Sequence, residues 1–382
     1  MYKRDLWLEL ISNAWKLRPI VWLSGVRRVG KTTIAKMIPD AIYLNCDLPS
    51  TAQKLQDPEL FFNQLPESSE IIFDEVHRLA DPSLILKIAA DEYPHLKILA
   101  TGSSTLAATN KFRDSLTGRK ITIHLPPVLW TESQTVFNQK SLDHRLINGG
   151  LPEMLLSADR NPEFYAEWLD SFYARDIQEL FSIRQRTGFL KLLRLLFRQS
   201  GGLLQYSNLA KMSGISRPTV NSYLEAMQIA NAVFLLPPFH GGGRREITHQ
   251  PKGYGFDTGF VAFLNGWNTL RGSERGLLWE HLVIDSLRTF IPDHDLYYWR
   301  DKSGREVDFV IKANNNKTIA IECKISPERL ESNNQLAFRS IYPDGENYII
   351  CPYVKEPYHI RSQGLIIRVI SPENIRLITK NI

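Results

Sequence analysis

A phosphate-binding loop is the feature of this sequence that most directly indicates chemistry. Residues 22–33 read Trp-Leu-Ser-Gly-Val-Arg-Arg-Val-Gly-Lys-Thr-Thr, a complete G-x-x-x-x-G-K-[ST] pattern between an apolar run and a helix-like run. The backbone N–H groups of such a loop curl around the β-phosphate of a nucleotide. Gly25 and Gly30 permit turns and a close approach that side chains would block, and the following helix points its positive end at the same phosphates. The alternative, a chance glycine turn beside a lysine, is disfavoured by the flanking strand and helix patterns.

Two side chains of this loop have defined roles in nucleotide binding. Lys31 is expected to reach the β- and γ-phosphates, and the Thr32 hydroxyl to hold Mg²⁺. ATP with Mg²⁺ is therefore the expected cofactor. The loop residues expected to contact the nucleotide are Gly25, Val26, Arg27, Arg28, Val29, Gly30, Lys31, Thr32 and Thr33.

A pair of acids at the end of an apolar run supplies the second half of a nucleotide site. Residues 71–75 read Ile-Ile-Phe-Asp-Glu, which predicts a buried parallel strand with carboxylates at its C-terminal edge. Ligands bind at that edge in open α/β sheets. We expect Asp74 to hold Mg²⁺ and Glu75 to act as the general base that orients the attacking water. The alternative is a strand that runs into a solvated acidic turn.

The next apolar run, residues 97–100, is followed by hydroxyl side chains and later by arginines. Thr101 or Ser103 would sense the γ-phosphate from the end of this strand, although Thr-Gly-Ser is also ordinary turn chemistry. Arg113 or Arg119 would stabilise phosphoryl transfer in a neighbouring subunit. The alternative for each arginine is an ordinary surface position.

A second group of acids and a lysine lies near the C-terminus. Residues 303–311 and 320–325 read as two strands with an asparagine-rich turn between them. Alternation of side chains along each strand places Asp308 away from its apolar neighbours, and Glu322 and Lys324 on one face of the next strand. Antiparallel pairing would bring these three side chains to one surface.

This trio has a chemical use on phosphodiesters. Two carboxylates can hold Mg²⁺ or Mn²⁺, which polarises a phosphodiester and activates water. Lys324 beside the metal would lower the pKa of the water and stabilise the charged transition state. The arrangement resembles the PD-(D/E)xK nucleases, with Asp308 as the first acid and Glu322-x-Lys324 as the second element.

A helix acid strengthens the prediction of a metal site. The apolar residues of the expected helix 277–290 form a stripe that also contains Glu280. A carboxylate on a core-facing edge is costly unless it is paired or bound to metal. We therefore expect Glu280 beside the metal held by Asp308 and Glu322. The alternative is a strand pair with solvated charges, or a degenerate nuclease fold that serves as a binding platform.

The elements between these two sites predict a winged helix. Residues 204–224 read as a helix, a tight turn at Gly214, and a second helix capped by Ser216. A glycine- and arginine-rich tract at 241–245 would form the tip of a basic wing. The outward polar residues of the second helix have the composition of a groove-reading helix; these are Arg217, Thr219, Asn221 and Ser222. A scaffold that only links the two outer domains is the alternative.

Length and composition limit what these elements can build. At 382 residues the chain is expected to hold two or three domains. A net charge of +5 permits a nucleic-acid partner without requiring one, and the three cysteines lack metal-ligand spacing. The sequence shows neither a signal-peptide pattern nor a run apolar enough to span a bilayer, which favours a cytoplasmic protein.

The predicted fold is α/β, with four parts in one chain. They are a P-loop AAA-like ATPase domain (1–135), a helical lid and linker (136–185), a winged-helix module (186–255) and a mixed α/β restriction-endonuclease-like domain (256–382).

Nearly the whole chain resembles AAA-like prokaryotic ATPases of a branch with a restriction-endonuclease-like C-terminal domain, mostly of unknown function. The motifs that carry the resemblance are the loop at Gly25, the Asp74-Glu75 pair and the sequences at 101–104, 149–153 and 173–177. Many AAA-like ATPases use an asparagine at the sensor strand, where this chain has only Thr and Ser. The resemblance implies an oligomer whose sites are completed by an arginine from a neighbour.

Two functions follow from the sequence. The preferred one is an ATP-dependent, DNA-acting protein whose ATPase controls a metal-dependent nuclease-like domain. The alternative is an ATP-driven switch or scaffold that binds DNA or a protein partner through a non-cleaving nuclease-like fold.

Overall fold

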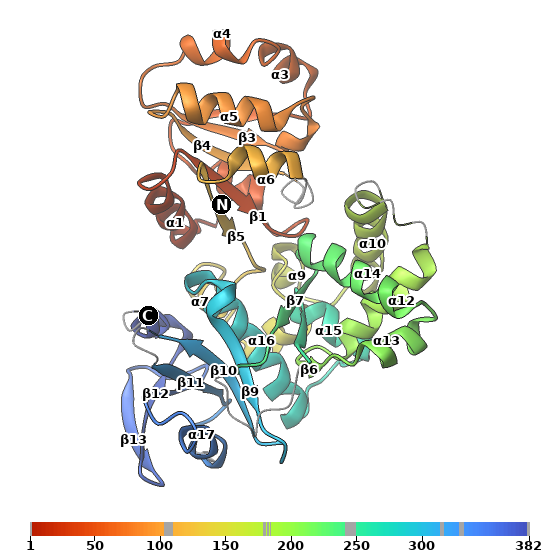
Figure 1. The fold of residues 1–382 in the computed structure, drawn as a ribbon, viewed down its shortest axis with the longest axis vertical. Helices are drawn as coiled ribbons and strands as arrows, with labels where there is room; N and C mark the ends of the chain where they lie inside the picture. The colour runs from red at the N-terminus through yellow and green to blue at the C-terminus, as the bar shows by residue number, and fades with distance from the viewer. Residues whose placement is uncertain are drawn as a thin grey trace. The chain divides into compact units, whose positions relative to one another are not determined.

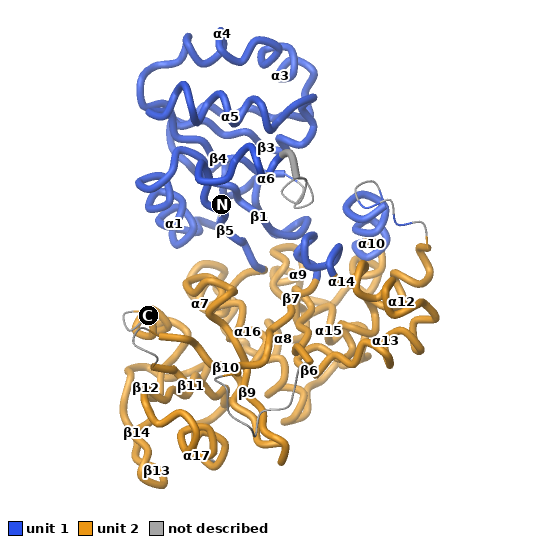
Figure 2. The backbone as a smooth tube through the Cα atoms, viewed as in Figure 1, with its two compact units in different colours: residues 1–126, 168–184, 225–232 blue, residues 127–167, 185–224, 233–382 orange. Residues whose placement is uncertain are grey.

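The computed structural model describes residues 2–102, 110–178, 181, 183, 185–240, 250–313, 317–327 and 332–379. Its contacts divide the chain into two compact units (Figure 2): residues 1–126, 168–184 and 225–232 form one, and residues 127–167, 185–224 and 233–382 form the other. Ser103, the side chain of Arg113 and the expected wing tip at 241–245 lie outside the described residues. The four-part division expected from the sequence stays a prediction.

The first unit is built on a five-stranded parallel sheet with the strand order β2-β3-β4-β1-β5. The strands are β1 (Ile20–Ser24), β2 (Ile42–Asn45), β3 (Glu70–Asp74), β4 (Lys97–Thr101) and β5 (Lys120–His124). The apolar runs that precede the phosphate-binding loop, the acid pair and the hydroxyl cluster are therefore neighbouring parallel strands, as expected. Their C-terminal ends lie along one edge of the sheet because the strands are parallel.

Helices cover this sheet (Figure 1). α5 and α6 contribute Leu86, Ala89, Phe112 and Leu116 to a core that also contains the strand residue Trp22. Burial of both faces explains why these strands read as continuous apolar runs. The helical elements are α1 (Asp5–Trp15), α2 (Lys31–Ala35), α3 (Pro49–Lys54), α4 (Pro58–Asn63), η1 (Val76–Arg78), α5 (Pro82–Glu92), α6 (Asn110–Leu116) and the π-helical η3 (Tyr173–Gln178).

The middle of the chain is mainly helical. Its helices are α7 (Trp130–Thr135), α8 (Leu142–Asn148), α9 (Pro152–Leu156), α10 (Pro162–Phe172), α12 (Arg186–Arg198), α13 (Tyr206–Ser213), α14 (Arg217–Ile229) and α15 (Thr258–Asn265). The two helices expected around Gly214 are α13 and α14. Gly214 has a φ of +72°, and Ser216 Oγ accepts a hydrogen bond from the N–H of Thr219 at 3.2 Å. The Ser216 cap and the glycine turn are thus confirmed.

A small antiparallel sheet accompanies α13 and α14. Its order is β6-β8-β7, formed by β6 (Gly202–Leu203), β7 (Val233–Leu236) and β8 (Lys252–Gly255). A helix pair followed by a two-stranded ribbon is the element order of a winged helix, and the identity of this module as a winged helix stays a proposal.

The C-terminal part contains a six-stranded mixed sheet with the order β13-β14-β12-β11-β10-β9. Its strands are β9 (Leu296–Arg300), β10 (Glu306–Lys312), β11 (Thr318–Cys323), β12 (Gly345–Ile350), β13 (Tyr358–Ser362) and β14 (Leu365–Ile370). The helical elements are α16 (Gly272–Phe290), η4 (Asp293–Asp295), α17 (Asn333–Arg339), η6 (Pro372–Asn374) and α18 (Arg376–Thr379). α17 packs on the sheet through Phe338, which contacts Trp299, and Trp279 of α16 donates to Ile350 O of β12 at 3.0 Å.

The helix expected at 277–290 begins earlier than predicted. Its buried residues are also not confined to a single apolar stripe. α16 starts at Gly272, and its buried residues include His281, Asp285 and Ser286. Leu277 and Phe290, the apolar residues at the two ends of the expected helix, are only half-buried. The helix is enclosed on most sides, so polar positions are buried together with apolar ones.

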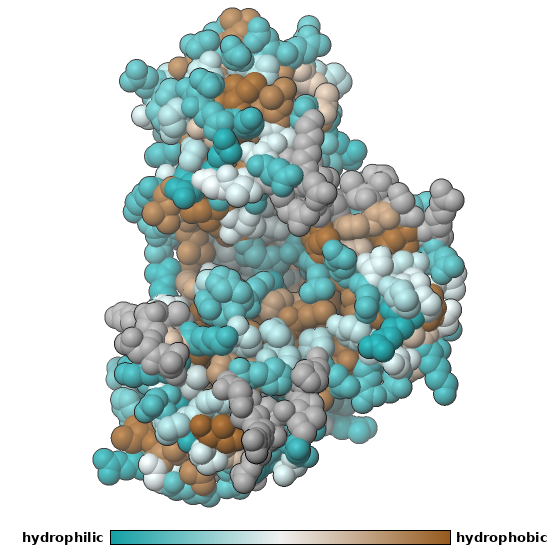
Figure 3. Space-filling view, in the orientation of Figure 1, coloured by the Kyte–Doolittle hydropathy of each residue, from teal (hydrophilic) through white to brown (hydrophobic). Residues whose placement is uncertain are grey.

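Among the described residues, no helix is both long and apolar enough to cross a membrane. The face shown in Figure 3 is mostly hydrophilic, with separate hydrophobic patches.

Candidate functional site

The phosphate-binding loop connects β1 to α2 and has the backbone that its glycines permit. Gly25 has a φ of +153°, and a Cβ at this position would lie 2.5 Å from the backbone oxygen of Leu125. Gly30 has a φ of +104° and precedes the first residue of α2. Both positions therefore require glycine. Because α2 is only five residues long, the loop's own N–H groups are the main source of anion-binding dipoles.

Lys31 folds back over this loop. Its Nζ donates to the carbonyl oxygens of Gly25 at 2.8 Å and Val26 at 3.1 Å. Burial lowers the pKa of Lys31, while the carboxylates of Glu75, Asp176 and Asp74 act to raise it. The ammonium is thus held by two carbonyls and surrounded by acids, in the loop where a phosphate would accept its hydrogen bonds.

Asp74 is the centre of the hydrogen bonds at the carboxyl edge of the sheet. Its Oδ1 accepts from the hydroxyls of Thr32 at 3.2 Å and Thr101 at 2.5 Å. Its Oδ2 accepts from the hydroxyl of Tyr43 at 2.5 Å. Burial and this hydrogen bond raise the pKa of Tyr43. The structure thus brings together Thr32 and Asp74, the two oxygen ligands expected for Mg²⁺, and adds two hydroxyls that hold the carboxylate in place.

The Thr101 side chain forms hydrogen bonds with both residues of the acid pair. Besides donating to Asp74, its hydroxyl accepts a hydrogen bond from the backbone N–H of Glu75 at 3.1 Å. In this arrangement the side chain fixes the turn after β3. Whether it also senses the γ-phosphate stays a prediction.

Glu75 lies at a conformationally costly position beside a histidine. Its φ of +57° is in the left-handed region, which costs a non-glycine residue of order 1 kcal/mol or more. Its Oε2 lies 3.2 Å from His77 Nδ1. Burial lowers the pKa of His77 to about 4, so this histidine is neutral at pH 7. Burial also raises the pKa of Glu75, which makes it a better base than a fully solvated carboxylate.

Sequence reasoning missed several residues around this site. Tyr43 and His77 are two of them. Arg27 of the loop lies 3.7 Å from Asp176 Oδ2, and Asn231 Nδ2 donates to Ser24 Oγ at 3.0 Å. Asp176 belongs to a motif quoted for the family resemblance, which was the available signal. Asn231 offered none, because its contact joins residues far apart in the chain.

The two candidate arginines differ in what the structure shows of them. Arg119 forms a two-point ion pair with Asp91 of α5, at 2.5 Å and 3.0 Å. An action of Arg119 in a neighbouring site would require this pair to open. Arg113 is the other candidate, and its side chain is outside the described residues.

The C-terminal acids and lysine meet where β10 and β11 stop pairing. The ladder includes Phe309 opposite Ile321, and beyond it Asp308 Oδ2 accepts the backbone N–H of Cys323 at 2.7 Å. Lys324 Nζ donates to Glu322 Oε2 at 3.0 Å. The structure therefore brings Asp308, Glu322 and Lys324 together, as their alternation along the strands indicated.

Lys324 compensates this pair of carboxylates only in part, through its ion pair with Glu322 at 3.0 Å. Burial raises the pKa of Asp308, and the nearby Glu322 and Glu280 raise it further. Burial also raises the pKa of Glu322, against the opposing effect of Lys324. Within the described residues, Glu322 Oε1 is buried and has no hydrogen-bond partner. A cation bound at this oxygen would give it a partner and would stabilise the ionised forms of Asp308 and Glu322.

Glu280 has other partners. Its Oε1 accepts from Lys252 Nζ at 3.0 Å and from the Tyr254 hydroxyl at 2.5 Å. Lys252 also binds Glu306 Oε1 at 2.5 Å and is 3% exposed. Burial alone would lower the pKa of Lys252, but the surrounding carboxylates raise it. Sequence reasoning missed Lys252 and Tyr254, which belong to β8, far from the acids along the chain.

The residues fit a divalent cation in part. Asp308 and Glu322 offer carboxylate oxygens, and Glu322 Oε1 has no hydrogen-bond partner among the residues that the structure describes. Hard divalent cations prefer such ligands. Glu280 is held by Lys252 and Tyr254, so the expected three-acid set of Glu280, Asp308 and Glu322 is not assembled. Across the described part of the chain, no group of three or more His, Cys, Asp or Glu side chains is arranged to hold a metal.

Family comparisons divide the chain into three consecutive parts. Residues 17–134 match an AAA domain, residues 139–271 match a domain of unknown function (DUF8612), and residues 275–370 match a second domain of unknown function (DUF4143). The first match, together with the loop geometry, supports ATP binding and hydrolysis by an AAA-like P-loop domain. The other two descriptions assign no activity.

Relatives and solved structures resemble longer parts of the chain. Uncharacterized proteins of Mycobacterium tuberculosis and Mycobacterium bovis are each 27% identical over 315 residues, covering 79% of this chain and 69% of the relative. A Walker-type ATPase of Pyrococcus abyssi is similar with 16% identity and a TM-score of 0.43, over 69% of this chain and 96% of that one. The RuvB Holliday junction branch migration motor of Thermotoga maritima shows 16% identity and a TM-score of 0.31, over 62% of this chain and 90% of that one.

Proposed function

We propose that this chain is an ATP-hydrolysing, DNA-acting protein whose nucleotide state controls a metal-dependent nuclease-like C-terminal domain. ATP is expected at residues 25–33, and DNA at the helix pair α13–α14 and at the C-terminal acids. The active form is proposed to be a homo-oligomer in which Arg113 or Arg119 completes a neighbouring site.

In the ATPase domain, the phosphates would replace the carbonyls that now hold Lys31. Its Nζ would leave Gly25 O and Val26 O and donate to the β- and γ-phosphate oxygens. Thr32 and Asp74 would hold Mg²⁺, which neutralises charge on the transferring phosphoryl group. Glu75 would take a proton from the attacking water, and neutral His77 would orient its carboxylate.

In the C-terminal domain, Asp308 and Glu322 would hold the divalent cation. A bound Mg²⁺ or Mn²⁺ polarises a phosphodiester and lowers the pKa of water. Lys324, already 3.0 Å from Glu322 Oε2, would stabilise negative charge on the phosphate oxygens. The observation that carries this part of the proposal is the buried Glu322 Oε1, which has no hydrogen-bond partner among the described residues.

DNA binding by the middle module is supported by its exposed polar residues. Arg217, Asn221 and Ser222 are exposed on α14, downstream of the Ser216 cap. A helix with these side chains at its N-terminal end is suited to contacting phosphates and base edges in a groove.

One observation favours the second candidate function, a switch or scaffold that does not cleave. Lys252 already neutralises Glu280 and Glu306 at 3.0 Å and 2.5 Å, which leaves fewer acids for metal. In that case the C-terminal domain binds DNA or a protein partner, and ATP hydrolysis changes its affinity.

A cleavage assay distinguishes the two functions. Purified full-length protein is incubated with linear and circular DNA, with Mg²⁺ or Mn²⁺, and with and without ATP. The proposal predicts cleavage that requires the metal, changes with ATP and disappears in Asp308→Asn. Glu373→Gln, an exposed acid of η6, is the matched control and should cleave normally. An absence of cleavage under all conditions, together with unchanged DNA affinity of Asp308→Asn, favours the switch.

A further inference from the structure

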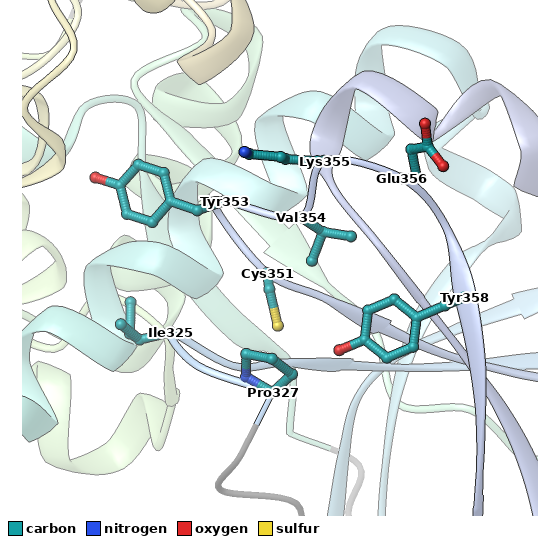
Figure 4. Close-up of a pocket in the computed structure, with 8 residues that line it drawn as sticks. All are labelled: Ile325, Pro327, Cys351, Tyr353, Val354, Lys355, Glu356 and Tyr358. Carbon is teal, nitrogen blue, oxygen red and sulfur yellow. The ribbon is translucent and has the colours of Figure 1, made fainter.

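A surface pocket of the C-terminal domain lies just beyond the ends of β11 and β12 (Figure 4). Its volume is about 320 Å³, near the lower end for pockets that bind small molecules. Its lining includes Ile325, Pro327, Cys351, Tyr353, Val354 and Tyr358. A volume of this size suits one planar group better than an extended ligand.

The pocket adjoins Lys324 through the backbone of the sheet. Ile325 follows Lys324 directly in the chain, and Pro327 comes two residues later. The N–H of Lys324 donates to Ile350 O at 3.1 Å, which places Lys324 beside Cys351 in the floor of the pocket. The ammonium of Lys324 also acts on the pKa of the Cys351 thiol. If a phosphate of a DNA strand binds at Lys324, the neighbouring nucleotide of that DNA strand would therefore lie at this pocket.

The pocket has an apolar floor and aromatic sides. In Figure 4, Tyr353 and Tyr358 lie on opposite sides of Cys351, and the Tyr358 hydroxyl points inward, toward Cys351 and Pro327. Tyr353 and Tyr358 are 59% and 40% exposed, which is unusual for large rings. The Tyr353 ring packs edge-on against Trp130, with ring centroids 5.9 Å apart, so it is already held in place.

We propose that this pocket binds one unstacked base of a DNA strand whose phosphate lies at Lys324. Every base has a flat apolar face that stacks on aromatic side chains, and such stacking tolerates any sequence. Lys355 and Glu356 also line the pocket and carry opposite charges, so the positive charge for the DNA phosphate comes from Lys324. The inference rests on the proposed function, because it takes the acid and lysine group to be a phosphodiester site. The inference also specifies the substrate: the DNA must be single-stranded or locally opened, because the bases of a duplex are already stacked.

The test uses the full-length protein and single-stranded DNA, with Ca²⁺ in place of Mg²⁺ so that binding is measured without cleavage. One abasic position is moved along a labelled oligonucleotide that is just long enough to span the site, so that binding independent of sequence cannot shift to another register. For the wild-type protein, affinity should fall about 5- to 100-fold when the abasic position coincides with the pocket. Tyr358→Ala should weaken binding of the intact strand by a similar factor and abolish the dependence on the abasic position. Tyr358→Phe, which keeps the ring, and Tyr2→Ala, an exposed tyrosine of the other unit, should behave as the wild type.

The outcomes separate this inference from the proposed function. Wild-type protein that binds the strand equally at every abasic position overturns the base pocket, and leaves metal-dependent cleavage and its loss in Asp308→Asn untouched. Wild-type protein that binds no DNA overturns both. The abasic series on wild-type protein does not depend on the folding of any variant.

Discussion

At the scale of single residues, the ATPase domain is organised around Asp74. One of its oxygens accepts from Thr32 and Thr101, and the other from Tyr43. These hydroxyls fix the carboxylate before any metal arrives, so little reorganisation is needed on binding. Glu75, the next residue, makes different contacts, and its left-handed backbone turns it away from the direction of the strand. The two adjacent acids can therefore have separate roles.

Replacement of Glu75 tests this separation. Glu75→Gln should bind ATP with near-normal affinity and hydrolyse it roughly 10²–10⁴-fold more slowly, because the water loses its base while Asp74 keeps the metal. Phosphate release and nucleotide binding are the measurements. Glu67→Gln, an exposed acid before β3, is the matched control. Normal turnover by Glu75→Gln would place the base at another residue.

At the scale of elements, a tight connection holds α8, α9 and α15 together. Asp257 is 1% exposed. Its carboxylate accepts from the N–H groups of Gly150 at 2.6 Å and Gly259 at 2.8 Å. The guanidinium of buried Arg145 donates to Val128 O and to the Thr258 hydroxyl. The glycine pair at 149–150 therefore allows the segment between α8 and α9 to pack closely against Asp257, at the start of α15.

The close packing of Gly149 against Asp257 leads to a prediction about stability. A Cβ at Gly149 would lie 2.0 Å from Asp257 Oδ1, and its φ is +82°. Gly149→Ala should therefore lower the free energy of unfolding by about 2–4 kcal/mol, through backbone strain and crowding. Gly276→Ala is the control, because a Cβ there has nothing within 4 Å and alanine favours a helix by up to about 1 kcal/mol. Denaturant unfolding followed by tryptophan fluorescence is the measurement, and equal midpoints for Gly149→Ala and wild type would contradict the prediction.

A second prediction concerns Asp285, which is 6% exposed on α16. Burial raises its pKa to about 7, compared with about 3.9 in an unfolded chain. Between these values the folded state keeps a proton that the unfolded state has lost, so stability falls as the pH rises through this window. The loss is complete above pH 7 and amounts to about 4 kcal/mol at most.

Asp285→Asn removes this dependence. Relative to the wild type, the variant should gain stability as the pH rises from about 4 to about 7, and the difference should level off above pH 7. Thermal unfolding midpoints across this range are the measurement. A constant difference between the two proteins at every pH would show that Asp285 titrates normally.

The parts of the structure that the sequence predicted correctly depend on local signals. The loop at Gly25, the strand ending at Asp74 and the cap at Ser216 are each defined within about ten residues. Alternation along two neighbouring strands sufficed to bring Asp308 and Glu322 together. These patterns involve backbone geometry that a few adjacent residues determine.

The parts that were missed depend on contacts between distant residues. Lys252 was assigned to the middle module, yet its ammonium lies 3.0 Å from Glu280 Oε1. Tyr43 lies on a neighbouring strand, and only the strand order brings it to Asp74. The apolar stripe expected for helix 277–290 failed to anticipate buried His281 and Asp285, because burial on several sides removes the periodic pattern.

At the scale of the whole molecule, the phosphate-binding loop and the C-terminal acids belong to different compact units. We expect Asp308→Ala and Glu322→Ala to abolish divalent-cation binding at the C-terminal site and any DNA cleavage, with ATP hydrolysis retained. Lys324→Ala should bind the cation and lose cleavage, because it acts on the reacting groups rather than on the ion. Calorimetric titration with Mn²⁺ and a parallel ATPase assay are the measurements. Loss of ATP hydrolysis in all three variants would show that the two activities are not separable.

The central claim is that the loop at residues 25–33 binds and hydrolyses ATP, and Lys31→Ala tests it most directly. Steady-state phosphate release and binding of labelled ATP are measured on the folded variant beside Lys54→Ala, an exposed lysine at the end of α3. We predict that Lys31→Ala abolishes hydrolysis and greatly weakens ATP binding, while Lys54→Ala matches the wild type. ATP turnover by folded Lys31→Ala at the wild-type rate would contradict the account.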